Sequence, residues 1–156
     1  MGVSGAGKSV VGTRLAEALG VPFGEGDELH PAANVAKMAS GQSLDDTDRA
    51  PWLDRVAAWL VAHSAGVIAC SALRRVYRDR LRTAAPDTCF VLLSVPRAAL
   101  EERLHKRRGH FMPAALLDSQ LEALEPLTSD ERGITVPPAK DVAATVDAIL
   151  ARLPHA

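Results

Sequence analysis

A glycine-rich stretch at the start of the chain carries the clearest chemical signal, and it reads Gly2-Val3-Ser4-Gly5-Ala6-Gly7-Lys8-Ser9. The spacing matches G-x-x-x-x-G-K-[ST], in which glycines let successive backbone N–H groups point at phosphate oxygens. Apolar residues of helical spacing follow directly, and the N-terminus of a helix favours negative charge. Gly2 to Val10 are therefore predicted to bind the phosphates of a nucleotide. An incidental glycine-rich turn before a helix is the alternative.

Two side chains of this loop are expected to handle the phosphate charge. Lys8 would place its ammonium group on the β- and γ-phosphates as a mobile point charge. The hydroxyl group of Ser9 would ligate the magnesium ion that bridges those phosphates. The loop therefore predicts ATP and Mg2+, with Lys8 as a catalytic residue and Ser9 as a metal ligand.

A loop of this kind normally follows a buried strand in the middle of a sheet, yet only Met1 precedes Gly2. We therefore expect the first strand to be missing from this chain, which would leave neighbouring strands unpaired and the loop poorly anchored. About six apolar residues added upstream are predicted to raise the melting temperature and the affinity for ATP.

Short apolar runs alternate with longer segments of helical period along the rest of the chain, which predicts βα units around a parallel sheet. Gly20 is expected to end the first helix, because glycine readily adopts the left-handed conformation that closes many helices. The expected strands are 21–24, 67–71, 89–95 and 134–136, and the expected helices include 11–19, 52–60, 74–84, 97–108, 114–124 and 139–153. With no repeat or linker, residues 1–156 are predicted to form one α/β domain.

The charge balance and composition exclude several classes of partner. Eighteen Lys and Arg residues against nineteen Asp and Glu give a net charge of -1, so no broad positive field exists to hold nucleic acid or an anionic membrane. No run approaches the ~18 apolar residues of a membrane span. Cys70 and Cys89 both lie in apolar runs, which suits reduced thiols in a core. We therefore expect a soluble cytoplasmic protein with no nucleic-acid or membrane partner.

A second constellation follows the expected strand at 21–24. It comprises Gly26-Asp27-Glu28-Leu29-His30-Pro31, Asn34, Lys37-Met38, Gly41, Leu44, Asp46, Asp48-Arg49 and Trp52-Leu53. This arrangement resembles the gluconokinase family, whose pattern G-D-x-x-H-P-x-x-N-x-x-K-M precedes G-x-x-L-x-D-x-D-R-x-x-W-L. Further matches, among them Cys70-Ser71-Ala72-Leu73 and His110-Phe111, extend the resemblance from Gly2 to about Pro126.

The resemblance implies phosphoryl transfer from ATP to the 6-hydroxyl of D-gluconate, which gives 6-phospho-D-gluconate. It also implies a P-loop, nucleoside-kinase-like fold of the shikimate-kinase type. In that fold a parallel sheet carries helices on both faces, in three layers, and a short lid covers roughly residues 103–118. A homodimer is implied by the resemblance alone.

Asp27 and His30 are the expected partners of the sugar hydroxyls. Asp27 lies just beyond an expected strand, where it would accept or orient the hydrogen of the attacking hydroxyl, or hold a magnesium-bound water. Those roles stay open, and a solvated loop carboxylate is the alternative. His30 would offer a hydrogen bond to a sugar hydroxyl, although a histidine before proline is often an ordinary residue at the start of a helix.

Lys37 and Arg49 could meet the carboxylate of gluconate, for which the planar fork of Arg49 is the better geometric match. Surface ion pairs with the nearby carboxylates of residues 45, 46 and 48 are the alternative. Those three aspartates resemble a metal cluster only superficially, and we expect them to cap the helix that begins before Pro51.

Arginines concentrate in two segments, at 74–82 and at 103–108. In the first, Arg78 shares a helical face with arginines four residues away on either side, so it is expected to point at substrate. In the second, Arg103 and Arg107 lie one turn apart and would reach phosphate oxygens when the lid closes. The family match adds His110 to the substrate-binding residues. A solvated helix face is the alternative for each group of arginines.

Two other functions remain as alternatives. A shikimate-kinase-like small-molecule kinase would share the loop, but it should show a glycine-rich turn where this chain has Cys70-Ser71-Ala72-Leu73. An inactive, N-terminally truncated nucleotide-binding protein would bind ATP without turnover.

Overall fold

The structure is a computed structural model that describes residues 1–106 and 114–154. Its strands are β1 (Phe23–Glu25), β2 (Val67–Ala69), β3 (Phe90–Leu93) and β4 (Gly133–Val136). Its helices are α1 (Lys8–Leu19), α2 (Ala32–Ala39), α3 (Asp46–Ala62), α4 (Arg75–Ala84), α5 (Arg97–Lys106), α6 (Ala114–Ala123) and α7 (Val142–Leu150), with a short 3-10 helix η1 (Gly26–Leu29). Each predicted strand and helix overlaps one of these elements, while α2 and η1 were not predicted. The bounds differ: β1 runs one residue past the predicted 21–24, and α1 and α3 start before the predicted residues 11 and 52.

Helix ends follow the local signals that the sequence carries. Gly20 closes α1 in the left-handed conformation, with φ of 66°. Asp45 caps α3, because its side chain accepts a hydrogen bond from the Asp48 backbone while the Asp48 side chain accepts one from the Asp45 backbone. The prediction that these aspartates start a helix is therefore confirmed.

The described strands form two separate parallel pairs, β1 with β2 and β3 with β4. Phe23 lies opposite Val67 in the first pair, and Phe90 lies opposite Gly133 in the second. Parallel pairing is confirmed, so the carboxyl ends of the strands in each pair lie at the same edge, and the contacts of Met1 and Gly2 with the ends of β3 and β2 bring these two edges together. Two of the strands, β2 and β3, end earlier than predicted.

Met1 and Gly2 lie between the two pairs at that edge. The Met1 nitrogen donates to the Val91 carbonyl oxygen at 2.6 Å, and the Leu93 N–H donates to the Met1 carbonyl oxygen at 3.0 Å. On the other side, the Gly2 N–H donates to the Ser71 carbonyl oxygen at 3.2 Å. Within the described part of the chain, no strand joins β2 to β3 beyond this bridge.

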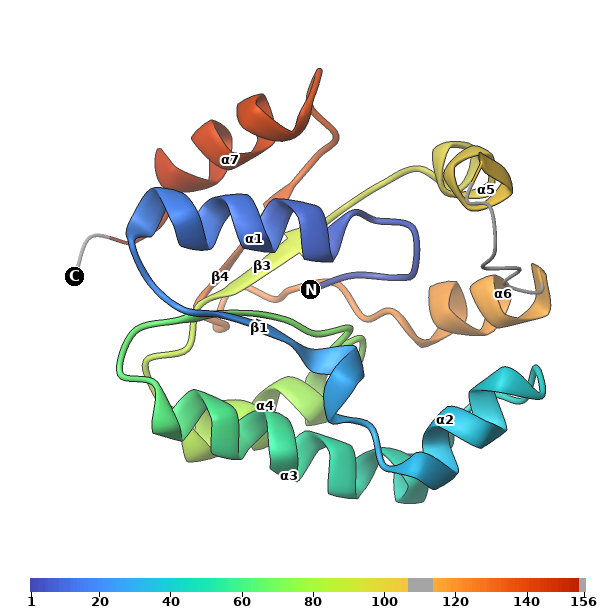
Figure 1. The fold of residues 1–156 in the computed structure, drawn as a ribbon. Coiled ribbons are helices and arrows are strands. Elements are labelled where there is room, and N and C mark those ends of the chain that lie inside the picture. Colours follow the sequence, from blue (N-terminus) through green and yellow to red (C-terminus); the bar gives the residue numbers. More distant parts are fainter. Residues whose placement is uncertain (107–113, 155–156) are drawn as a thin grey trace.

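Helices cover both faces of the strands, as predicted (Figure 1). α1 and α7 contact each other on one face, and α3 and α4 contact each other on the other. α5 and α6 extend beyond the turn that precedes α1, next to the phosphate-binding loop. No helix among the described residues is long and apolar enough to cross a membrane.

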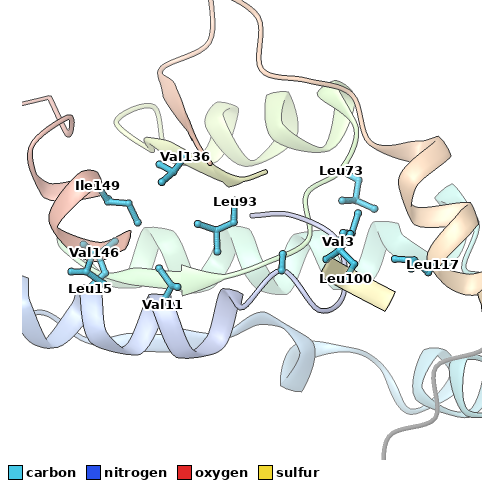
Figure 2. Packing of buried hydrophobic residues seen from close by; sticks show 11 residues of the cluster. Val3, Val11, Leu15, Leu73, Leu93, Leu100, Leu117, Val136, Val146 and Ile149 are labelled. Carbon is cyan, nitrogen blue, oxygen red and sulfur yellow. The ribbon is translucent and has the colours of Figure 1, made fainter. Parts of the chain in front are cut away.

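The main apolar core joins α1 and α7 to the strands and continues under the loop at residues 2–9 (Figure 2). Val11 and Leu15 of α1 belong to it, and so does Leu93 of β3. Val3 of the loop and Leu100 of α5 extend it toward the site. A second cluster, around Trp52 and Leu81, lies between α3, α4 and the other face of the strands. The loop is thus anchored by buried side chains as well as by backbone bonds.

Candidate active site

Backbone conformation shapes the phosphate loop, residues 2–9. Gly2, Gly5 and Gly7 adopt φ values of 139°, 82° and 93°, which side chains disfavour. The Ala6 N–H donates to the Val3 carbonyl oxygen at 3.2 Å, and the Lys8 ammonium group donates to the same oxygen at 3.2 Å. α1 starts directly at Lys8, so the unsatisfied N–H groups of its first turn meet the loop. This is the local arrangement that a phosphate group requires.

Helices α5 and α6 contact the loop from outside. Arg103 donates from Nη1 toward the carbonyl oxygens of Gly5 and Ala6, at 3.4 and 3.5 Å. The Ser4 N–H donates to Oε1 of Gln120 at 2.7 Å. The structure therefore brings Arg103 to the phosphate loop. Arg107 and His110, with much of the expected lid, lie outside the described residues.

A cavity of about 410 Å³ adjoins the loop, and sequence reasoning missed it. Its walls include Gly7, Val10 and Arg103, together with the segment 136–145 that follows β4. Pro137 and Pro138 could have pointed to this cavity from the sequence. They directly follow a predicted strand, and that strand ends at the same edge as the loop. The volume falls in the range of small-molecule sites.

Asp27 lies on η1, immediately after β1, and its side chain is exposed. Gly26 holds this turn against β2, since a Cβ atom there would overlap the Ala69 carbonyl oxygen. Trp52 donates from Nε1 to the Gly26 carbonyl oxygen at 2.7 Å. Asp27 is thus fixed at the carboxyl edge of the strands, the edge that also carries the phosphate loop.

His30 is held by two neighbours. Its ring stacks on Trp52 with centroids 4.5 Å apart and an interplanar angle of 9°. The side-chain amide nitrogen of Asn34 lies 3.3 Å from Nδ1 and donates to it in the tautomer that carries its proton on Nε2. Burial lowers the pKa of His30, the Asp27 carboxylate opposes that shift, and the Arg49 guanidinium adds to it. The charges of Asp27 and Arg49 therefore both act on the His30 ring.

Lys37 is engaged with the first turn of α3. Its ammonium group lies 2.5 Å from Oδ2 of Asp48 and 3.7 Å from Oδ2 of Asp45. The hydrogen bond to Asp48 is the main cause that raises the pKa of Lys37. For Lys37, the structure therefore shows the surface ion pair that was the alternative to binding the gluconate carboxylate.

Arg49 and Arg74 flank the ring of Tyr77, each with its guanidinium carbon 5.7 Å from the ring centroid. Arg49 donates to the Tyr77 hydroxyl oxygen at 3.3 Å, and Tyr77 donates to the Asp46 carboxylate. Arg74 donates to the other oxygen of Asp46 at 2.7 Å. The hydrogen bond from Tyr77, followed by that from Arg74, lowers the pKa of Asp46. Arg74 and Tyr77 thus bind one exposed carboxylate, and Arg49 lies against the same tyrosine. Sequence reasoning missed this contact of Arg74 and Tyr77 with Asp46.

Several known proteins similar to this chain are gluconokinases or probable gluconokinases. A family model described as an AAA domain matches residues 1–127. The gluconokinase of Gluconobacter oxydans (strain 621H) is 51% identical over 141 residues, which cover 87% of this chain and 79% of that protein. The chain belongs to the gluconokinase family.

Solved structures agree with this membership. The gluconokinase from Sinorhizobium meliloti 1021 is 47% identical, with a TM-score of 0.86 over 97% of this chain and 87% of that chain. A sugar kinase from Janibacter sp. HTCC2649 is 41% identical, with a TM-score of 0.91 over 97% and 90% of the two chains. A shikimate kinase from Aquifex aeolicus, 18% identical with a TM-score of 0.60 over 97% and 91%, shares the fold alone. The predicted three-layer kinase fold is confirmed.

One substrate residue predicted for this gluconokinase-family chain needs correction. Arg78 is only 1% exposed and pairs with the buried Glu131, at 2.5 Å from Nε and 2.9 Å from Nη2. Its remaining donors meet backbone carbonyl oxygens, including those of Leu73 and Glu125 at 3.1 Å. The hydrogen bond from Arg78 lowers the pKa of Glu131 to about 2. Arg78 therefore fastens α4 to the segment before β4, because its helical face points into the protein rather than toward substrate.

The donor set fits a magnesium ion of the kind that kinases use. Ser9 is exposed on the first turn of α1, and Asp27 is exposed on η1. Oε1 of Glu25, at the end of β1, is buried with no hydrogen-bond partner among the described residues. Among the described residues, no group of three or more His, Cys, Asp or Glu side chains is placed to hold a metal ion. Magnesium bound chiefly to phosphates and water needs only one or two protein oxygens, so the fit holds.

Proposed function

We propose that this chain transfers the γ-phosphoryl group of ATP to the 6-hydroxyl of D-gluconate and so forms 6-phospho-D-gluconate. Membership of the gluconokinase family supports the kinase activity. The observation that carries the site assignment is that the phosphate loop and the turn with Asp27 both lie against the end of β2. The Gly2 N–H donates to the Ser71 carbonyl oxygen at 3.2 Å, and Gly26, the residue before Asp27, lies tightly against the Ala69 carbonyl oxygen.

On the donor side, the loop amides and Lys8 would hold the β- and γ-phosphates of ATP. The adjoining cavity of about 410 Å³ would receive the base. Ser9 and Glu25 would hold magnesium, directly or through water. When bound, that ion would neutralise charge on the transferring phosphoryl group. Arg103 already contacts the loop and would add positive charge there.

On the acceptor side, the Asp27 carboxylate would accept the hydrogen of the attacking 6-hydroxyl and orient its oxygen toward the γ-phosphate. The His30 Nε2–H would donate to another hydroxyl. Arg49 and Arg74 would bind the gluconate carboxylate, because Arg74 already binds the Asp46 carboxylate and Arg49 lies over the same tyrosine ring as Arg74. Lys37 stays with α3, while Arg107, His110 and a homodimer remain predictions.

A coupled assay tests this assignment with gluconate, shikimate and AMP offered in parallel as acceptors. We expect ADP to form with gluconate alone. Turnover with shikimate would favour the other small-molecule kinase, and ATP binding without any turnover would favour an inactive nucleotide-binding protein. The Lys8→Ala variant controls for contaminating kinases.

A further inference from the structure

Helix α6 contacts both halves of the proposed site, although the proposed reaction gives it no role. Its Leu117 is buried in the main apolar core, in the cluster that also contains Val3 of the phosphate loop and Leu100 of α5. Figure 2 shows these three side chains close together at one end of the core. Moving α6 away from the loop would expose Leu117 to water, so this contact fixes the helix beside the loop.

Gln120 bonds α6 to the backbone of the phosphate loop. Its Oε1 accepts a hydrogen bond from the Ser4 N–H at 2.7 Å. Ser4 lies between Gly2 and Gly5, which both have positive φ and carry no side chain to restrict the backbone. The acceptor that Gln120 supplies, from 116 positions further along the chain, therefore limits the conformations open to this part of the loop.

Ser119, the preceding residue, bonds α6 to the sugar-acid side. Its hydroxyl donates to the Leu116 carbonyl oxygen at 3.0 Å, which uses its single hydrogen. The Ser43 hydroxyl, 3.1 Å away, is therefore the donor to Ser119. Ser43 lies in the segment that leads into α3, shortly before the capping residue Asp45. The start of α3, which carries Arg49, is thus connected to α6.

The segment after α6 adds a third connection, to the arginines at the start of α4. Oε2 of Glu125 accepts from the Arg75 N–H at 2.5 Å, and Oε1 lies 3.7 Å from Nε of Arg74. The Glu125 N–H donates to the Leu73 carbonyl oxygen at 2.9 Å. Arg74, proposed to bind the gluconate carboxylate, is therefore also held by the segment that continues from α6.

We propose that α6 positions the two halves of the site against each other, with Gln120 holding the phosphate loop and Ser119 holding the start of α3. Adjacent side chains on an α-helix point about 100° apart, so these two can hold different parts of the protein. The proposal rests on the proposed function, in which the loop binds ATP and the other side binds gluconate. Phosphoryl transfer requires the acceptor oxygen in line with the phosphorus, so a small relative shift lowers kcat while each substrate still binds. Gln120 and Ser119 are positioning residues, because they act through the loop and through α3.

Four variants of the full chain and one control test the proposal. Gln120→Ala and Ser119→Ala each remove one bond, a double variant removes both, and Ser119→Thr keeps the hydroxyl. Glu122→Ala is the matched control, because Glu122 is exposed on the same helix and the change in helix propensity is similar. The measurements are kcat for gluconate, the melting temperature, and the dissociation constants of gluconate and of a non-hydrolysable magnesium–ATP analogue by calorimetry.

Gln120→Ala is expected to lower kcat about tenfold and Ser119→Ala about threefold, with each dissociation constant changed less than about twofold. The double variant should be no slower than Gln120→Ala alone, because breaking either bond already disconnects the two halves. Ser119→Thr should restore most of kcat. Glu122→Ala should match the unchanged protein in every measurement.

Unchanged kcat in both single variants would overturn the proposal. A double variant whose loss equals the product of the two single losses would also overturn it, by showing that the bonds act independently. So would a loss of kcat that accompanies an equal loss of melting temperature and is not restored by Ser119→Thr, because that pattern indicates a role in stability alone. Failure of the unchanged protein to phosphorylate gluconate would overturn the proposed function as well, whereas the other outcomes leave that function intact.

Discussion

The phosphate loop owes its shape to the backbone, with three glycines at positive φ between Gly2 and Gly7. The sugar-acid side instead depends on side chains that η1, α3 and α4 bring together, among them Asp27, Arg49 and Tyr77. A contiguous stretch of sequence therefore specifies the first region, whereas the second needs the folded chain. Substitutions in the loop should abolish turnover. Substitutions on the sugar-acid side should change either kcat or KM for gluconate, depending on the residue.

Replacing Lys8 should have the largest effect. We expect Lys8→Ala to lower kcat for gluconate by at least about a thousandfold, because the transferring phosphoryl group loses a cation that balances its charge. The melting temperature should stay near that of the unchanged protein, since the lysine side chain is only partly buried. Retained turnover with an intact fold would remove Lys8 from the reaction.

Replacing Asp27 should come next. Asp27→Asn is expected to lower kcat about a hundredfold, because the amide cannot take the hydrogen of the attacking hydroxyl. The dissociation constant for the magnesium nucleotide, measured by calorimetry, should change little. A large loss of nucleotide affinity with unchanged kcat would instead assign Asp27 to the metal.

Arg49 and Arg78 offer a matched pair within the sugar side. Arg49→Lys should raise KM for gluconate about tenfold with little change in stability, because the forked contact with a carboxylate is lost. Arg78→Lys should destabilise the fold, since it leaves buried Glu131 and several carbonyl oxygens without donors, while KM in the surviving enzyme stays constant. Urea unfolding and steady-state kinetics distinguish these outcomes. A raised KM for gluconate in Arg78→Lys, without a loss of stability, would instead assign Arg78 to the substrate site.

The smallest expected effect concerns the N-terminal amine, which lies beside both regions. Its pKa is near 8.0 when unfolded and about 5 when folded, so the unfolded chain binds more protons between those values. Stability should therefore fall as the pH drops from 8 to 5, while Lys8 strengthens the effect and Cys70 opposes it. Fraying of the first residues limits the loss to about 1–2 kcal/mol.

Acetylation of Met1 should flatten this pH dependence, because the amide does not titrate in that range. Thermal unfolding of both forms at several pH values, with mass spectrometry to verify that Met1 is retained, provides the measurement. An identical slope for the two forms would show that the amine is not buried.

Local patterns predicted a large part of the molecule correctly. The phosphate loop, the end of α1 at Gly20 and the capping of α3 by Asp45 each depend on residues within a few positions. Parallel pairing followed from the alternation of strands and helices. All of these features are encoded over short sequence distances, so periodicity and spacing are sufficient to find them.

The errors and omissions involve partners distant in sequence. Arg78 was placed on the right helix but on the wrong face, because its partner Glu131 lies 53 residues away. The convergence of Arg74 and Tyr77 on Asp46 spans about thirty residues and has no local signature. The bridge made by Met1 depends on two separate strand pairs. Such contacts depend on how the elements pack, which spacing alone does not specify.

The central claim is that loop-bound ATP and a sugar acid held by Asp27 and Arg49 face each other, so that phosphate moves to the terminal hydroxyl. Phosphorus–proton correlation NMR of the product formed from ATP and gluconate tests it most directly. The account predicts one new phosphate ester, coupled to the two protons on carbon 6. An ester at any other carbon, or no ester from a folded protein that binds ATP, would contradict it.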